Sequence, residues 1–269
     1  MRKQIISLFL CLLIVSPNFA QTVFNHPWQG KRVAYLGDSI TDPNHKAAGK
    51  KYWAYLQEWL GITPFVYAVS GRQWNDIPRQ AEQLCNEHGN DFDAIIIFIG
   101  TNDFNAGVPV GTWFTETEED LNVDIYDSKV TEKRKKLTPI MTDSTYCGRI
   151  NIAISTVKKM FPCKQVVVMT PIRRSIYVNK KGHCQQSDNY CNKTGEYLSA
   201  YVEASKECGN IWAVPVIDLN ALCGLNPLMD EHRQYFKDGG KDLLHPNDKG
   251  HERMARTIMQ QLLVLPCTF

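Results

Sequence analysis

Short runs of apolar, often β-branched residues alternate with helical patterns along this chain, and that alternation is its strongest constraint on fold. The runs lie at residues 33–36, 65–69, 94–99, 166–169 and 212–217. Between them, apolar residues recur at helical spacing, as at Trp53, Leu56 and Leu60. Such runs are typical of strands buried on both faces, and helices connect parallel strands through right-handed crossovers. The pattern therefore predicts a central five-stranded parallel sheet between two helical layers, a three-layer α/β/α sandwich.

The end of the chain and one internal stretch depart from this alternation. Apolar residues at positions 254, 258, 262 and 263 predict a final helix, begun by Asn247 or Asp248 as its cap. From Phe104 to Tyr146 the pattern fails, and an acidic run at 116–120 precedes a basic run at 133–136. Loops longer than about 15 residues are uncommon unless functional or disordered. We predict an insertion at about 104–146 beside the functional site, with a solvated excursion as the alternative.

The first twenty residues have the features of a secretory signal peptide. Arg2 and Lys3 precede an apolar run at residues 5–15, and the segment ends on Asn-Phe-Ala at residues 18–20. The run is shorter than the roughly 20 residues that a membrane-spanning helix needs. We expect cleavage after residue 20, export to the periplasm or the medium, and one domain at 21–269. A lipid anchor on Cys11 is the alternative, but Cys11 lies inside the apolar run rather than after it.

Loss of this leader changes both the charge and the cysteine count. The formal charge falls from +2 to zero, which argues against nucleic acid or anionic membranes as partners and favours a small-molecule or glycan substrate. Eight cysteines remain, at positions 85, 147, 163, 184, 191, 208, 223 and 267. Spacing favours only a Cys184–Cys191 disulfide, and buried free thiols are the alternative. Because histidines do not cluster with cysteines, we expect no metal site.

A candidate nucleophile follows the first predicted strand. The segment Gly37-Asp38-Ser39-Ile40-Thr41 places Ser39 in a strand-to-helix turn. In folds of this class, ligands bind at the carboxyl ends of the strands. A serine in such a turn is often only a helix cap, so the assignment depends on partners elsewhere in the chain.

A candidate acid–base pair lies near the end, in Asp242-Leu243-Leu244-His245-Pro246-Asn247. On a turn, a carboxylate three residues before a histidine reaches Nδ1–H and leaves Nε2 free to take the proton of Ser39. Asp248 and His251 have the same spacing and are a rival pair. We prefer His245, because Pro246 and Asn247 hold it in the loop before the last helix.

Oxyanion donors are expected along the same edge of the sheet. The second predicted strand ends in Ser70-Gly71 and the third in Gly100-Thr101-Asn102-Asp103. Acyl transfer needs preorganised donors for the tetrahedral oxyanion, and the amides of Ser39 and Gly71 with Asn102 Nδ2 are candidates. Taken singly, Gly71 also fits a tight turn, and Asn102 also fits a helix cap or a bridge between loops.

Together, GDSIT, Gly71, GTND and DLLHPN resemble, in order, the four motif blocks of the SGNH (GDSL-type) hydrolases. The resemblance implies Ser39 as nucleophile, Gly71 and Asn102 as oxyanion donors, and Asp242 with His245 as acid and base. It also implies a flavodoxin-like fold and esterase or lipase activity without a cofactor. The lone Ser-Gly of the second block is the weakest match, and the long insertion directly follows the third block.

The substrate is predicted from the residues around these motifs. Trp74, Trp113 and Phe114 are candidates for a flat platform under a sugar ring, with packing as the alternative for each. Together with export and neutral charge, they favour an exported carbohydrate O-acetylesterase. A lipid acyl-hydrolase or thioesterase is the first alternative, although the insertion is too polar to indicate an apolar channel. A non-catalytic carbohydrate-binding protein on the same scaffold is the second.

Overall fold

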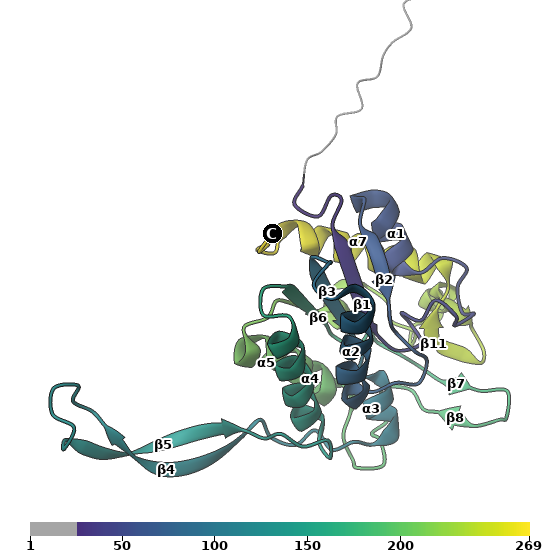
Figure 1. Ribbon diagram of the computed structural model, residues 1–269. Coiled ribbons are helices and arrows are strands. Elements are labelled where there is room, and N and C mark those ends of the chain that lie inside the picture. Colours follow the sequence, from purple (N-terminus) through teal and green to yellow (C-terminus); the bar gives the residue numbers. More distant parts are fainter. Residues whose placement is uncertain (1–25) are drawn as a thin grey trace, which may run out of the picture.

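The computed structural model describes residues 26–269, and a five-stranded parallel sheet lies at its centre (Figure 1). The strand order is β2-β1-β3-β6-β9, with every neighbouring pair parallel. The strands are β1 (Arg32–Gly37), β2 (Thr63–Val66), β3 (Ala94–Phe98), β6 (Gln165–Met169) and β9 (Val216–Ile217). The predicted α/β/α sandwich is confirmed, whereas the predicted signal peptide lies outside the described residues.

The central strand β3 shows why these runs become strands. All five of its residues are buried. Ile95 and Ile97 pack into one apolar cluster, whereas Ile96 and Phe98 pack into the other. Successive strand residues point to opposite faces, so a run that is apolar throughout can supply both layers of core at once.

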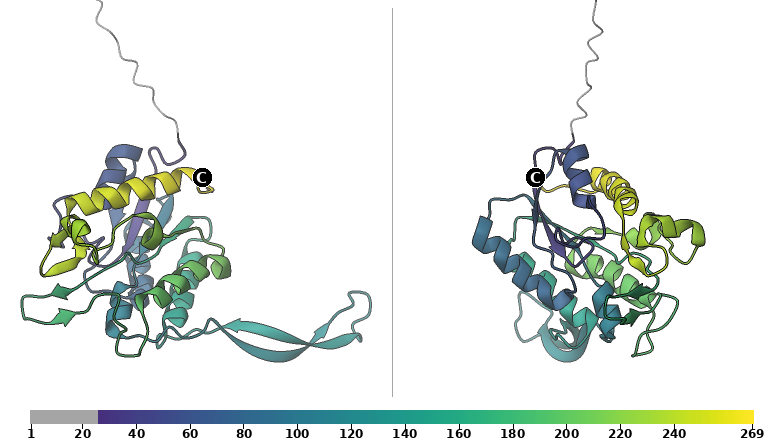
Figure 2. Two further views of the ribbon diagram at one scale, coloured as in Figure 1. Left: turned by 180° about the vertical axis from the view of Figure 1, so that it is seen from behind. Right: turned by 90° about the vertical axis from the view of Figure 1, so that its right-hand side faces the viewer.

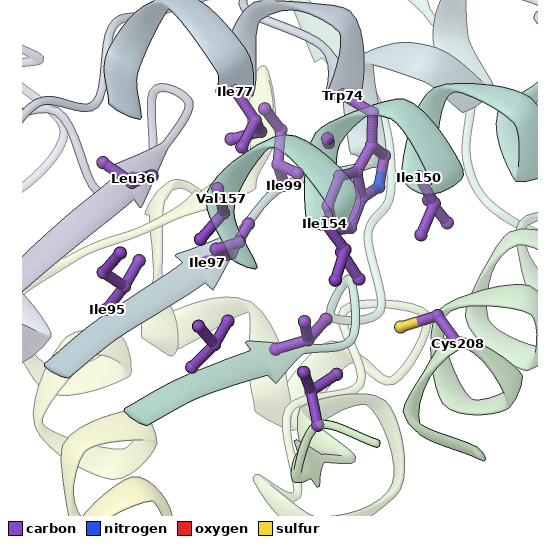
Figure 3. Packing of buried hydrophobic residues seen from close by; sticks show 14 of the residues in the cluster. Leu36, Trp74, Ile77, Ile95, Ile97, Ile99, Ile150, Ile154, Val157 and Cys208 are labelled. Carbon is purple, nitrogen blue, oxygen red and sulfur yellow. The ribbon is translucent and has the colours of Figure 1, made fainter. Parts of the chain in front are cut away.

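Helices cover both faces of the sheet. One face carries α2 (Ile77–His88), α4 (Tyr146–Met160) and α5 (Leu198–Trp212), and the other carries α1 (Tyr52–Leu60), the short α6 (Leu219–Leu222) and α7 (Asp248–Val264). Figure 2 shows α1 and α7 across the sheet from α2. Figure 3 shows Val157 of α4 beside Ile97 of β3, and Ile150 and Ile154 of the same helix in the same cluster of buried residues. The helical spacing of α4 in the sequence is therefore its sheet-facing stripe.

The final helix begins where the sequence indicated. Asn247 is the N-cap of α7, and its side chain accepts a hydrogen bond from the Gly250 amide. Met254, Ile258 and Leu262 are buried against the sheet. This cap fixes the chain immediately after His245, so the helix start and the predicted base are positioned together.

The run at 212–217 was predicted too long as a strand. Trp212 is the last residue of α5, and Ala213 turns the chain with a φ of 50°. Only Val216 and Ile217 pair with the sheet, as β9. Apolar periodicity cannot separate the end of a buried helix from the start of a buried strand, which explains the error.

The segment predicted as an insertion contains an antiparallel hairpin, β4 (Phe114–Asn122) with β5 (Thr131–Pro139), that projects from the body (Figure 1). The acidic and basic runs face each other across it: Glu118 is opposite Lys135, and Asp120 is opposite Lys133. Nearly all of its residues are exposed. Both faces of this ribbon are polar, so its sequence shows neither the helical nor the strand spacing of apolar residues that marks an element packed on a core. A short helix, α3 (Thr101–Ala106), precedes the hairpin and carries Asn102.

A smaller sheet completes the fold, in the order β10-β11-β7-β8. Its strands are β7 (Tyr177–Val178), β8 (Cys184–Gln185), β10 (Phe236–Asp238) and β11 (Asp242–Pro246). Two short 3₁₀ helices, η1 (Trp74–Asp76) and η2 (Asp230–Tyr235), precede α2 and β10. Because β11 contains both Asp242 and His245, this sheet positions the predicted acid–base pair.

All eight cysteines of the described chain are unpaired, so the predicted Cys184–Cys191 disulfide is wrong. Cys184 contacts its own neighbours, through the Gln185 carbonyl at 3.9 Å and Gln186 Nε2 at 3.7 Å. Cys147 and Cys208 are buried in the core, as the alternative of buried thiols expected. No helix in the described part of the chain is long and apolar enough to cross a membrane.

Candidate active site

Three strands deliver the predicted site residues to one edge of the main sheet. Ser39 follows β1 and Asn102 follows β3, and Gly71 lies in the loop after β2. Gly37 allows the Ser39 turn to lie against β3, because a Cβ at this position would be 2.3 Å from the Phe98 carbonyl oxygen. The glycine of the motif is thus required by close backbone approach.

Ser39, His245 and Asp242 form a continuous hydrogen-bonded chain. Ser39 Oγ lies 3.0 Å from His245 Nε2. His245 Nδ1 lies 2.9 Å and 3.0 Å from the two carboxylate oxygens of Asp242. All three residues are buried. This arrangement allows His245 to take the hydroxyl proton while Asp242 fixes the imidazole tautomer.

Asp242 and His245 lie in strand β11, not on the predicted turn. In a regular strand, residues three apart point to opposite faces. Here the His245 amide donates to Asp242 Oδ1 at 3.1 Å, and the pairing of β11 with β10 is irregular. The Asp242 side chain therefore lies along its own strand toward His245. This gives the contact with Nδ1 that was expected from a turn.

Asp242 is held in its charged form. Burial alone would raise the pKa of its carboxyl, but hydrogen bonds from the side chain and amide of His245 outweigh burial and lower that pKa. A charged Asp242 stabilises the imidazolium that forms when Ser39 loses its proton.

The rival pair has other roles. Asp248 accepts the amides of Gly49 and Lys50 at 2.6 Å and 3.0 Å. His251 is fully buried in α7, where its Nδ1 accepts the Tyr52 amide at 3.3 Å. These contacts leave His245 as the histidine beside Ser39.

Two aromatic side chains enclose the ring of His245. His45 lies against its face, with ring centroids 4.2 Å apart and planes tilted by 34°. Tyr177 of β7 meets it edge-on, at 5.1 Å and 87°. The pKa of His45 is lowered to about 4, chiefly by burial, so this ring is neutral near pH 7. Sequence reasoning missed both residues, although His45 lies only six positions after Ser39.

The predicted oxyanion donors differ in whether they already have a hydrogen-bond partner. The amides of Ser39 and Gly71 donate to no group within residues 26–269, and Gly71 has a φ of 81°. Asn102 Nδ2 donates to the Arg72 carbonyl at 2.9 Å and to Asp38 Oδ2 at 3.3 Å. The second of these bonds is the longer and weaker one. A substrate oxygen that replaced Asp38 as the acceptor would receive a hydrogen bond from Asn102 Nδ2.

The aspartate of the motif is shielded from water. Asp38 Oδ1 accepts the Ile40 amide at 3.1 Å. Burial raises the pKa of Asp38 to about 7, in spite of that bond. Its carboxyl is thus easily neutralised, which limits its competition with an oxyanion for Asn102.

A buried ion pair supports Asn102 indirectly, through the side chain of Gln73. Arg149 of α4 donates to Asp103 Oδ1 at 2.9 Å and to Gln73 Oε1 at 2.8 Å. Gln73 in turn donates to the Asn102 carbonyl at 3.0 Å. Helix α4 thereby holds the loop after β2 against helix α3, a link that no motif indicated.

The predicted aromatic platform is not formed. Trp74 has no exposed area and lies in the core beneath α4 (Figure 3). Trp113 is buried, and its Nε1 donates to Glu207 at 2.7 Å. Phe114 is half-buried against the same core. The platform prediction is wrong for Trp74, because a ring with no exposed area offers no face to a sugar. Trp113 and Phe114 line a cavity whose lining includes no residue of the Ser39–His245–Asp242 chain.

Within the described residues, no group of three or more histidine, cysteine, aspartate or glutamate side chains could hold a metal ion. The hydrogen-bonded chain of Ser39, His245 and Asp242 provides a hydroxyl nucleophile and a histidine base, the groups that acyl transfer through a serine uses.

Comparison with solved structures supports the fold. A possible lipase from Chitinophaga pinensis is 21% identical over 86% of this chain and 98% of its own, with a TM-score of 0.61. A member of the lipolytic G-D-S-L family from Veillonella parvula is 14% identical over 87% and 99%, with a TM-score of 0.55. A variant acetyl xylan esterase from Geobacillus stearothermophilus is 19% identical over 87% and 95%, with a TM-score of 0.52. No curated protein sequence matches the chain.

The sequence itself matches the GDSL-like lipase/acylhydrolase family over residues 35–253. The match includes Ser39, Asn102, Asp242 and His245, the residues that the fold brings together. The chain therefore belongs to the GDSL-like lipase/acylhydrolase family, the SGNH hydrolases, which act on ester bonds.

Proposed function

We propose that this esterase removes acetyl groups from carbohydrate, with Ser39 as nucleophile and His245 as base and acid. The observation that carries the proposal is a cavity with mainly polar side chains in its wall, one of which, His45, lies against the ring of His245. Its volume of 650 Å³ falls within the range of ordinary ligand sites.

The proposed reaction has two halves. Ser39 Oγ attacks the ester carbonyl carbon as its proton moves to His245 Nε2, and the oxyanion is bound by the amides of Ser39 and Gly71 with Asn102 Nδ2. The carbon–oxygen bond to the alcohol then breaks, and His245 gives its proton to the leaving oxygen. Water, deprotonated by the same His245, attacks the acyl-enzyme and releases acetate and free Ser39.

The cavity supports a sugar as the alcohol. Its side chains are mainly polar, among them His45, Gln234 and Asn247, and its other walls are the small residues of the loop at 43–49. His45 both lines this cavity and touches the ring of His245. We infer that the leaving alcohol occupies this cavity, whose hydrogen-bonding side chains suit sugar hydroxyls better than a lipid chain.

The loop after β2, which carries Gly71, is also polar. Asp42 accepts both the amide and the hydroxyl of Ser70, and Gly71 and Arg72 follow directly. A short acyl group fits these surroundings better than a long apolar one. The acetyl xylan esterase of similar fold acts on an acetylated glycan, and its likeness supports the scaffold for such a reaction.

The test compares p-nitrophenyl acetate with a long-chain p-nitrophenyl ester, and then acetylated xylan, using residues 21–269. We expect hydrolysis of the acetate, a lower rate on the long-chain ester, and release of acetate from the glycan. Ser39→Ala and His245→Ala should each abolish these activities. Preference for the long chain would indicate a lipase, and a folded protein inert on every ester would indicate a binding protein.

We also propose that the chain is exported, from the basic and apolar pattern of its first twenty residues. Expression of the full sequence in a bacterial host should yield periplasmic or secreted protein that starts at residue 21. Cytoplasmic protein with an intact amino terminus would contradict export without affecting the esterase assignment.

A further inference from the structure

We propose that the cavity beside His245 is the subsite for the leaving alcohol, and that it selects sugars bearing a carboxylate through Lys46 and Lys249. This inference rests on the proposed function, because it names the class of carbohydrate whose ester is cleaved. Its substrates are acetylated acidic glycans.

The position of the cavity assigns it to the alcohol side of the ester. The predicted oxyanion donors Gly71 and Asn102 follow β2 and β3. The cavity instead lies between the loop at 43–49 and the start of α7, where His45 and Asn247 contribute to its wall. His245 must face the leaving oxygen to protonate it, and the cavity begins at the ring stacked on His245.

The wall of the cavity is held at both ends, so the subsite is preorganised. Asp42 accepts the Ser70 amide and hydroxyl at 2.9 Å and 2.6 Å. At the other end of the loop, Asp248 accepts the amides of Gly49 and Lys50. The loop with His45 and Lys46 is thus tied to the main sheet and to α7, and little of its freedom is left to be lost on binding.

The charge of the lining favours an anion. Lys46 and Lys249 both contribute to the wall, and neither forms an ion pair within residues 26–269. Among the described lining residues Asp248 alone is acidic, and its Oδ1 already accepts two backbone amides. The cavity wall therefore has two ammonium groups without an ion-pair partner, and one carboxylate that already accepts two backbone hydrogen bonds.

Further basic groups extend this positive potential toward the catalytic base. The lowered pKa of His45 results first from burial and then from basic groups that include Lys51 and Lys237. Lys51 is itself buried, and its Nζ has no hydrogen-bond partner in the described chain. The carboxylates of Asp42, Asp38 and Asp248 offset part of the charge of Lys51, so Lys46 and Lys249 are the ammonium groups open to a substrate carboxylate. A neutral His45 in the same wall can hydrogen-bond to sugar hydroxyls.

The experiment compares one acetylated polymer in two charge states. Acetylated homogalacturonan with free carboxylates and the same polymer with methyl-esterified carboxylates differ in charge but keep the same acetyl esters. Acetate release should give a kcat/KM about threefold to tenfold higher for the free carboxylate form, as expected for two solvent-exposed ion pairs. The difference should appear in KM and decrease with added NaCl.

A double variant assigns the preference to the cavity. Lys46→Gln with Lys249→Gln should reduce the ratio of the two kcat/KM values to about one. The matched control, Lys129→Gln with Lys159→Gln, removes the same charge from exposed positions outside the cavity and should keep the ratio of the wild type. Thermal unfolding of both double variants verifies that they are folded.

The outcomes separate this inference from the proposed function. Equal rates on both polymers, or a preference that survives in Lys46→Gln/Lys249→Gln, would overturn the anionic subsite and leave the carbohydrate esterase assignment standing. Failure to release acetate from both polymers and from acetylated xylan, with p-nitrophenyl acetate still hydrolysed, would refute the proposed function and this inference with it.

Discussion

The ion pair between Arg149 and Asp103 is the sharpest place to test how the fold holds the site. The Asp103 side chain is 0% exposed and that of Arg149 is 12% exposed, with 2.9 Å between Nη1 and Oδ1. Arg149→Met would leave the Asp103 carboxylate buried without its counter-charge. Removing one partner of a buried pair typically costs about 3–5 kcal/mol, which for a domain of this size lowers Tm by about 6–20 °C.

The loss of stability in Arg149→Met should increase as the pH rises. Burial raises the pKa of Asp103 to about 6, above its ordinary value of 3.8. Between about pH 4 and about pH 6 the Asp103 carboxyl is therefore protonated in the folded protein but ionised in the unfolded chain. Its contribution to the free energy of unfolding falls as the pH rises through this range. In Arg149→Met the folded-state pKa should rise further. The deficit relative to wild type should then be small at pH 4 and largest at pH 8.

Thermal unfolding followed by circular dichroism at pH 4 and pH 8 measures this difference. Arg79→Met is the matched control, because Arg79 is 60% exposed in its pair with Asp76 and its loss should cost at most about 1 kcal/mol. Equal deficits for Arg149→Met at the two pH values, or a deficit no larger than that of the control, would refute the reasoning.

Three further predictions concern the site and the thiols. Asp242→Asn should leave the fold intact and lower kcat on p-nitrophenyl acetate by about 10⁴-fold, because an amide no longer fixes the tautomer of His245; a loss below tenfold would count against the triad. His45→Ala should lower kcat about twofold to thirtyfold and His45→Phe should restore most of it, if the ring supports the imidazolium; equal loss in both variants would indicate a role for the ring nitrogens. In the folded protein a thiol reagent should label exposed Cys163, Cys184 and Cys191 but not buried Cys147 and Cys208, and mass spectrometry of the modified protein would detect any disulfide instead.

The parts of the fold that sequence predicted are those in which local pattern and burial coincide. Strand β3 is apolar on both faces, and α4 presents one apolar stripe, so each could be placed before any tertiary contact was known. The end of α5 was missed because Trp212 belongs to an apolar run that continues into β9. The disulfide between Cys184 and Cys191 was inferred from spacing alone, and spacing does not fix geometry.

The candidate site shows the same division. Ser39 and His245 were predicted because each stands at a recognisable place beside a strand or helix end. Arg149 and Tyr177 touch the site from elements distant in sequence, and only tertiary packing brings them there. Trp74 shows the converse error, a residue predicted at the site that lies elsewhere. It is three residues from Gly71 in sequence, yet in η1 its side chain is buried in the core. Nearness in sequence to a motif is therefore weak evidence for nearness to the substrate.

Three aspartates near Ser39 show how environment rather than residue type assigns chemical roles. Burial dominates at Asp38 and Asp103 and raises their pKa values to about 7 and about 6. At Asp242 the hydrogen bonds from His245 outweigh burial, and the pKa is lowered. Of these three, Asp242 alone is therefore firmly ionised across the range in which a histidine base operates. Asp38 stands next to the nucleophile in sequence but is poorly suited to pair with an imidazolium, and the charge that the mechanism needs is supplied by the carboxylate that also orients His245.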